Sequence, residues 1–296
     1  MTSEGNEDKG SRAGRWLGGV ASAAAAVGVS WLAGQGGSAL GPLPLAAAAA
    51  CFAVAVQWLA FVPAVLLRTE RFYDVTGSLT YLSLVGGLVV LGEPGPRGLL
   101  LAGCVALWAL RLGLFLGWRI HKTGGDGRFD AIKLDPSRFF VAWSLQGLWV
   151  TLTALAVTLT LTSDPEPLTA LDAVGWALFA AGFLIEAVAD AQKSAFKADP
   201  NTSGWCDRGL WAWSRHPNYF GEILLWTGLA VSAGSGFSGW EWLGLVSPLF
   251  VYVLLRHGSG VPLAEERWDQ RYGDDPAYQR WKAETPLLVP RPPRRG

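Results

Sequence analysis

A cluster of polar side chains interrupts apolar sequence in the last third of the chain, within residues 209–228 (GLWAWSRHPNYFGEILLWTG). The polar residues are Arg215, His216, Asn218, Tyr219 and Glu222. Proline suits the first turn of a helix, so a helix is predicted to begin at Pro217. Asn218 and Glu222 then share one face, four residues apart. Because unpaired N–H groups and the helix dipole attract anions, this segment is predicted to bind one.

Other polar residues lie in or beside apolar segments. They are Asp74, Tyr81, Arg111, Arg119, His121, Glu186, Asp190, Lys193, Lys197, Glu265 and Glu266. A charged group inside a bilayer is costly and is therefore a functional candidate. If these groups converge, they form a pocket with a cationic rim and a few carboxylates, which suits a phosphate-bearing cofactor.

Each candidate also has a structural interpretation. Arg119, Lys193 and Lys197 could be membrane-surface anchors whose long stems reach the interface. Asp74 could serve only as a counter-ion of Arg111, and Tyr81 could only pack. His216 could be a hydrogen-bonding scaffold, and the pair at 265–266 a solvated helix face. These alternatives remain open from the sequence.

The composition indicates a membrane protein. Of 296 residues, 51% are hydrophobic and 16% are charged, and 16 tryptophans are available for interfacial belts. The formal net charge is zero with no long basic run, so we expect no nucleic-acid partner. The three cysteines, Cys51, Cys104 and Cys206, are scattered, so we expect neither a disulfide framework nor a bound metal.

Apolar segments long enough to cross a bilayer predict an all-α fold, a polytopic transmembrane helix bundle of about eight spans. The expected spans are 16–33, 44–67, 72–91, 98–118, 139–161, 168–189, 219–233 and 240–256. The first is rich in Ala and Gly and the seventh is short. Small residues of this kind allow helices to pack closely.

The loops indicate the orientation of these spans. Basic residues gather in every second connection, at 68–71, 119–138 and 193–215, and in both terminal tails. The positive-inside rule then predicts an integral, multi-pass membrane protein with N- and C-termini cytoplasmic. The chain divides into a polar N-terminal tail (1–15), a transmembrane helical domain (16–260) and a cytoplasmic region of amphipathic helices and basic tail (261–296).

The last of these regions begins with a polar segment, 261–282, which is interrupted at 273–276 (GDDP). It predicts two short amphipathic helices at the membrane surface. Their aromatic residues could pack over a site or lie on lipid headgroups; they are Trp268, Tyr272, Tyr278 and Trp281.

Several motifs resemble the steroid 5-alpha-reductase-like family of membrane proteins of unknown function, the branch with SRHPNYFGE. They are FLIEAVADAQKSAFKADP, GLWAWSRHPNYFGEILLWTG, LRHGSGVPLAEERW and a Tyr-rich tail ending in LLVP, with FYDVTGSLTYL and LWALRLGLFLGWR upstream. The resemblance covers most of the chain after about Cys51.

The resemblance implies a membrane reductase that takes hydride from NADPH and delivers it to a carbon–carbon double bond of a lipid-soluble substrate. By this likeness Asn218 and Glu222 hold the nicotinamide or its ribose. Asp190 and Lys197 secure the rest of the dinucleotide, and Arg111 and Arg119 bind its phosphates. Arg215, His216, Tyr219 and Glu265 complete the cofactor set. Asp74, with Tyr81 near it, is the acid that polarises an enone carbonyl, since hydride attack leaves an enolate-like oxygen that needs a proton donor.

The chain also departs from the steroid reductases. They carry a tyrosine just before the arginine of the fourth span, where this chain has Trp108. The pattern R-H-P-x-Y with a later E-E is also similar to the isoprenylcysteine and phospholipid methyltransferases, which use S-adenosylmethionine. A non-enzymatic lipid-binding protein is the third alternative. Membrane lipids are expected partners in every case.

Overall fold

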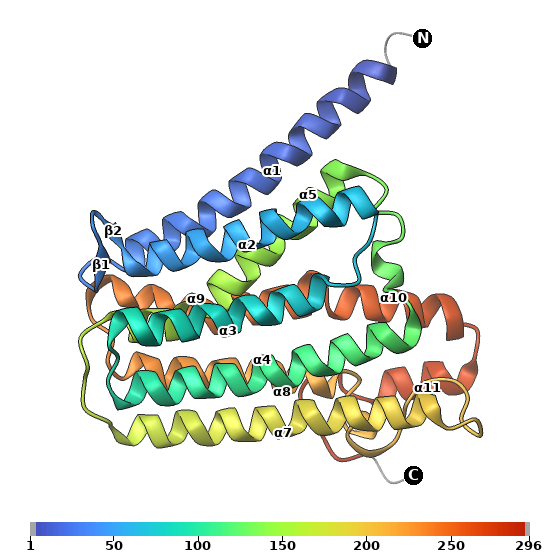
Figure 1. Cartoon of the computed structure of the whole chain (residues 1–296). Coiled ribbons are helices and arrows are strands. Elements are labelled where there is room, and N and C mark those ends of the chain that lie inside the picture. Colours follow the sequence, from blue (N-terminus) through green and yellow to red (C-terminus); the bar gives the residue numbers. More distant parts are fainter. Residues whose placement is uncertain (1–3, 294–296) are drawn as a thin grey trace. The chain divides into compact units, whose positions relative to one another are not determined.

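The structure is a computed structural model that describes residues 4–293, with side chains from residue 11 onward. Helices make up nearly all of the regular structure (Figure 1). In the described residues the strands are β1 (Ala39–Leu40) and β2 (Leu43–Pro44), which form one short antiparallel hairpin. The prediction of an all-α fold is therefore confirmed.

Five helices are long and apolar enough to cross a bilayer. They are α1 (Glu4–Ala33, of which residues 11–33 qualify), α2 (Leu45–Leu67), α3 (Tyr73–Gly92), α4 (Pro96–Thr123) and α7 (Ala170–Ala198). A sixth crossing is made if α5 (Pro136–Thr153) and α6 (Leu155–Thr162), which meet at 55°, form one bent span. The expected integral membrane protein is thus supported in the described part of the chain.

Two expected spans do not meet the same criterion, so five described helices qualify, or six with the bent pair, where about eight spans were predicted. The seventh forms α8 (Pro217–Gly234), where Asn218 and Glu222 in the first turns lower the apolarity. The eighth is divided into a 3-10 helix, η3 (Gly239–Leu245), and the 12-residue α9 (Val246–His257). A helix of 12 residues is about 18 Å long, shorter than the hydrocarbon core.

The chain packs as two compact units. The first comprises residues 1–168 and 233–246, and the second comprises 169–232 and 247–296. These units are defined by packing. The division predicted from the sequence, into tail, transmembrane domain and cytoplasmic region, is defined by the expected solvent, and it stays a prediction.

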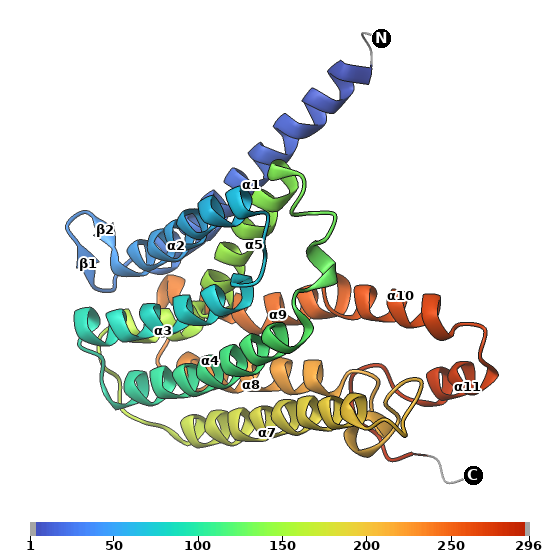
Figure 2. The ribbon, with the colours of Figure 1, turned by 45° about the vertical axis from the view of Figure 1, so that its right-hand side comes forward.

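In the first unit, α1 packs along α5 and α2, and α3 runs beside α4 (Figures 1 and 2). An aromatic cluster joins the ends of α2, α3 and α5 to the 3-10 helix η1 (Gly127–Phe129). Tyr73 and Phe139 contact Trp143 there with ring centroids 4.9 and 6.1 Å away. This cluster fixes the loop between α4 and α5 against the start of α3.

The second unit consists of α7, the 3-10 helix η2 (Gly209–Ala212), α8, α9 and two short helices, α10 (Val261–Tyr272) and α11 (Pro276–Glu284). The predicted pair of helices with a break at 273–276 corresponds to α10 and α11. The predicted helix start at Pro217 is likewise confirmed.

Glycines allow the antiparallel α7 and α8 to approach closely. A Cβ on Gly182 would lie 2.5 Å from the carbonyl oxygen of Gly221, and a Cβ on Gly175 would lie 2.5 Å from that of Gly228. Each helix therefore presents two glycines seven residues apart to the other. Contact of backbones through small residues is a common way to join helices in membranes. This contact sets the register that brings Asp190 of α7 to the start of α8.

Candidate functional site

The predicted site residues divide between the two units. Asp74, Tyr81, Arg111 and Arg119 belong to the first unit. The second unit contains the larger set, at Asp190, Lys197, Arg215, His216, Asn218, Tyr219, Glu222 and Glu265. Each set is described within its own unit.

The loop that leads into α8 is held on α7. Gly209 has φ +58°, a conformation that side chains disfavour, and a Cβ there would lie 2.5 Å from the Gln192 amide group. Gln192 Oε1 accepts the backbone N–H of Leu210 at 2.9 Å. The indole N–H of Trp211 donates to the carbonyl of Ala189, also at 2.9 Å. The backbone before Arg215 is therefore fixed by α7.

A second constraint comes from the end of the chain. Residues 286–291, here called the C-terminal strap, run beside residues 213–216. Three backbone hydrogen bonds join them: Arg215 N–H to Pro286 O (2.8 Å), His216 N–H to Leu287 O (3.2 Å) and Arg291 N–H to Trp213 O (3.0 Å). The Ser214 hydroxyl donates to the carbonyl of Leu288 at 2.8 Å. The strap thus holds the backbone of Arg215 and His216.

Glu265 of α10 is the centre of the charged cluster in this unit. Its Oε2 forms an ion pair with Arg215 Nη1 and lies 3.4 Å from Lys282 Nζ. Its Oε1 lies 2.8 Å from His216 Nε2. The neighbouring Glu266 is exposed and accepts a hydrogen bond from Gln270. Of the two carboxylates, only Glu265 belongs to the site.

The protonation of this cluster follows from its surroundings. Burial acts to raise the pKa of Glu265, but the hydrogen bond from His216 and the charges of Arg215 and Lys282 outweigh it, so the pKa is lowered. Burial lowers the pKa of His216, and Glu265 offsets this only in part. At neutral pH, Glu265 is therefore ionised and His216 neutral. Because a carboxylate only accepts, the His216 proton lies on Nε2.

Aromatic rings fix the orientation of His216. Its ring stacks on Tyr219 at 5.3 Å between centroids and on Trp268 at 5.4 Å, with interplanar angles of 6° and 7°. Lys193 Nζ lies 4.9 Å from the centroid of Trp268 and 4.2 Å from that of Trp211, close enough for cation–π contacts. Trp268 thus packs over the site, one of the two roles predicted for the aromatic residues of 261–282.

Asn218 carries a buried acceptor. Its side-chain Nδ2 donates to Asp190 Oδ1 at 3.3 Å, which directs the amide nitrogen toward the carboxylate. Its Oδ1 is buried and has no hydrogen-bond partner among the described residues. A buried carbonyl oxygen without a donor costs about 1–3 kcal/mol, so such an atom often receives a donor from a ligand or water. The atom lies in the first turn of α8. The first N–H groups of a helix generally have no carbonyl partner within the helix.

Lys197 and Glu222 lie on the two helices that bring Asp190 and Asn218 together. Glu222 follows Asn218 by one turn of α8, the spacing predicted from the sequence, and is half-buried. Lys197 is exposed in the last turn of α7, two turns beyond Asp190. The second unit therefore brings Asp190, Asn218 and the cluster around Glu265 to one end of the α7–α8 pair.

In the first unit, Asp74 belongs to a cluster of four charged groups. Its Oδ2 lies 3.5 Å from Arg119 Nη2 and 3.9 Å from Arg128 Nη2. Asp126 contacts the same two arginines, at 3.5 and 2.5 Å. The ion-pair partners shown for Asp74 are therefore Arg119 and Arg128. Two members of this cluster, Asp126 and Arg128, were not predicted from the sequence.

Tyr81 and Arg111 lie deeper in the same unit. Tyr81 is buried, and its ring meets that of Trp108 edge-on, with centroids 5.1 Å apart and an interplanar angle of 90°. The guanidinium carbon of Arg111 lies 5.7 Å from the ring centroid of Phe115. These contacts account for the position of Tyr81 by packing and leave its predicted role in proton donation as a prediction.

The structure also adds residues around Glu265. Lys282 bridges Glu265 and Asp269, and Tyr278 donates to Asp269 at 2.9 Å. The LLVP motif lies in the strap, which sequence reasoning noticed without assigning a role. Among the described residues, no group of three or more His, Cys, Asp or Glu is placed to hold a metal ion.

The fold and these clusters define a polytopic helical membrane protein with polar sites at the ends of its helices. The chain belongs to a family described as "Protein of unknown function (DUF1295)", whose profile matches residues 60–285. This is a family of membrane proteins related to the steroid 5-alpha-reductases. No curated protein and no solved structure shows significant similarity to the chain.

Proposed function

We propose that this protein is an NADPH-dependent reductase of a carbon–carbon double bond in a lipid-soluble, sterol-like or other lipid substrate. The observation that carries the proposal is the buried Oδ1 of Asn218, held by Asp190 in the first turn of α8. A carboxamide of this kind is complementary to the nicotinamide amide or a ribose hydroxyl. The nearby N–H groups of the helix start favour an anionic ligand.

In the proposed reaction, NADPH supplies a hydride to the carbon β to a carbonyl and becomes NADP⁺. The two electrons of the double bond move toward the carbonyl, which gains enolate character, and a proton from solvent completes the addition at the α carbon. The protonated carboxyl group of Asp74 and the hydroxyl group of Tyr81 are proposed to donate hydrogen bonds to the developing oxyanion, since an ionised carboxylate only accepts. Arg119 and Arg128 hold the Asp74 carboxyl group in place.

The cofactor assignment is tested by thermal unfolding of the purified protein with NADPH, NADH and S-adenosylmethionine in parallel. NADPH at a hundredfold excess over its Kd should stabilise the folded protein by about 2.7 kcal/mol. Asn218→Ala should lose this stabilisation while its unfolding without cofactor stays cooperative. Asn201→Ala, in an exposed loop, is the matched control. An undiminished NADPH response in Asn218→Ala would remove the central assignment.

The role of Asp74 needs a separate experiment. Asp74→Asn keeps the shape of the side chain but replaces the acidic proton with a weaker amide donor, so NADPH oxidation in the presence of an enone substrate should slow more than NADPH binding weakens. A proportional loss of both would make Asp74 a structural partner of Arg119 and Arg128.

A methyltransferase is the second candidate, favoured by one contact. Arg215, His216 and Glu265, which match the R-H-P and E-E positions of that pattern, lie together in one cluster. Stabilisation by S-adenosylmethionine and not by NADPH would move the protein to this class. No response to either would favour a non-enzymatic lipid-binding protein.

A further inference from the structure

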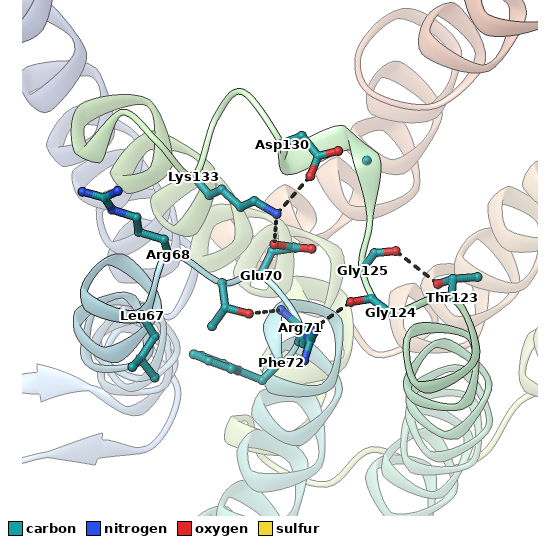
Figure 3. A pocket seen from close by; sticks show the side chains of 12 residues that line it. Leu67, Arg68, Glu70, Arg71, Phe72, Thr123, Gly124, Gly125, Asp130 and Lys133 are labelled. Atoms are coloured by element: carbon teal, nitrogen blue, oxygen red, sulfur yellow. Dashed lines mark hydrogen bonds and ion pairs between the residues drawn. The ribbon is translucent and has the colours of Figure 1, made fainter.

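The first unit contains an open pocket of about 730 Å³ that none of the predicted site residues lines (Figure 3). Its walls are the turn between α2 and α3, residues 67–72, and residues 123–133 after α4. The pocket therefore lies at the polar end of three membrane helices. This is the depth at which lipid headgroups are found.

Hydrogen bonds hold the two walls together. Lys133 Nζ lies 3.0 Å from Glu70 Oε2 and 2.9 Å from Asp130 Oδ1, and Glu70 Oε1 accepts the backbone N–H of Asp126 at 3.0 Å. Arg71 Nε donates to the carbonyl of Gly124 at 2.9 Å. The pocket is thus preformed by contacts between distant segments, as ligand sites usually are.

The charges in the pocket favour an anion. Burial acts to raise the pKa of Glu70, but the hydrogen bonds from the Asp126 N–H and from Lys133 outweigh this effect, so the pKa is lowered. Glu70 is therefore ionised at neutral pH, and Lys133 neutralises its charge. Overall, three cationic side chains, Arg68, Arg71 and Lys133, face two anionic ones. The uncompensated charge belongs to the arginines, whose planar guanidinium groups match phosphate geometry.

Arg68 occupies an unusual backbone conformation. It ends α2 with φ +49° and ψ +47°, the left-handed region in which glycine is common. A side chain other than glycine is disfavoured at such a position, because its Cβ approaches the following carbonyl oxygen. Glycine would be the more favourable residue at this helix end. The presence of arginine is therefore consistent with a binding role for its guanidinium group at the pocket rim.

An apolar surface leads away from the pocket. Leu67 and Phe72 line its wall, and on α2 the side chains of Leu59, Val62 and Leu66 are 72%, 51% and 76% exposed. Their spacing of three and four residues places them along one side of the helix. The polar pocket and this apolar side of α2 are together complementary to an amphiphile, which has a charged headgroup and an apolar chain.

We propose that this pocket binds the phosphate group of an anionic phospholipid, with Arg68 and Arg71 contacting the phosphate and the exposed side of α2 contacting an acyl chain. The site is independent of the reductase proposal, because none of its lining residues belongs to the candidate cofactor set.

The experiment measures thermal stabilisation of the full-length protein in detergent, without nucleotide, by dihexanoyl phosphatidic acid. Dihexanoyl phosphatidylcholine and glycerol 3-phosphate are the comparison ligands, each below its micellar concentration where one exists. Arg68→Gln and Arg71→Gln should each weaken the apparent affinity for phosphatidic acid about tenfold, the usual effect of losing a charged hydrogen bond. Arg280→Gln removes an exposed cation of α11 and is the matched control.

Asp130→Asn removes an anion from the pocket wall and should strengthen the response. The proposal requires phosphatidic acid to act more strongly than phosphatidylcholine, and Arg280→Gln to behave as the unaltered protein. Equal stabilisation by glycerol 3-phosphate would overturn the lipid assignment in favour of a soluble phosphate ester. In a second titration with NADPH present, competition between NADPH and phosphatidic acid would assign the pocket to the cofactor instead. Equal responses in Arg68→Gln and Arg280→Gln would exclude the pocket altogether.

Discussion

Glu265 and His216 illustrate how burial and pairing fix protonation at the level of single residues. The hydrogen bond between them joins an ionised carboxylate to a neutral imidazole, and the stacked rings of Tyr219 and Trp268 keep the imidazole in place. Since Nε2 carries the proton, Nδ1 remains an acceptor. The pair therefore behaves at neutral pH as a rigid, singly charged anion beside Arg215.

The lowered pKa of His216 makes the stability of the second unit depend on pH. Above the unfolded pKa of about 6.5 neither state binds the proton, whereas below it the unfolded state binds a proton that the folded state resists. Lowering the pH from 7 to 5.5 should thus cost up to about 1 kcal/mol of stability through this residue. Glu265, whose pKa is also lowered, keeps its contribution throughout this window and loses it only in stronger acid.

The measurement is the thermal unfolding midpoint in detergent between pH 7 and 5.5. His216→Asn is expected to be less stable at every pH but to show a flatter pH dependence, because the buried imidazole is gone. His257→Asn, at an exposed position of α9, should keep the dependence of the unaltered protein. An equally steep dependence in His216→Asn would mean that another group is responsible.

At the scale of elements, the contact between α7 and α8 positions the candidate cofactor site. The glycines at 175, 182, 221 and 228 let the two backbones touch, and the register of that contact brings Asp190 to Asn218. Close packing against α7 is thus sufficient to explain why position 221 is a glycine. The site depends on helix spacing as much as on its own side chains.

Gly182→Ala tests this contact. The new Cβ would lie 2.5 Å from two backbone atoms of α8, Gly221 O and Leu225 N, so the helices must separate. We expect a loss of about 1–3 kcal/mol, typical of overpacking, together with weaker NADPH binding. Gly103→Ala in α4, where a Cβ meets nothing within 4 Å, should be neutral or slightly stabilising. Matching thermal midpoints for the two variants would contradict close packing at Gly182.

Local signals in the sequence predicted many elements well. The span expected at 44–67 is α2 (Leu45–Leu67), and Pro217 begins α8 because proline fits the first turn. The bend at Ala154 was not predicted, since no proline or glycine stands at the break between α5 and α6. The strap was missed because it depends on contacts between segments far apart along the chain. The same holds for the cluster in which Asp126 and Arg128 meet Arg119 and Asp74.

At the scale of the whole molecule, the number of crossings decides where the termini lie. Helices α1, α2, α3, α4 and α7 are five candidate spans, and the bent α5–α6 pair would be the sixth. If α8 and the η3–α9 segment each cross, they add two, and if neither crosses they add none. In both cases the bent pair determines whether the count is even.

We predict that the α5–α6 pair crosses the membrane and that both termini are cytoplasmic, because the basic connections alternate with the nearly uncharged or acidic ones. Fusions to a fluorescent protein and to alkaline phosphatase in a bacterial host can test this after residue 168 and at the C-terminus. Phosphatase activity is expected only at 168, and fluorescence only at the C-terminus. A fusion within 93–95, between α3 and α4, should report the outside in either case and serves as the control. Fluorescence at 168 with phosphatase activity at the C-terminus would show instead that α5 and α6 form a re-entrant hairpin.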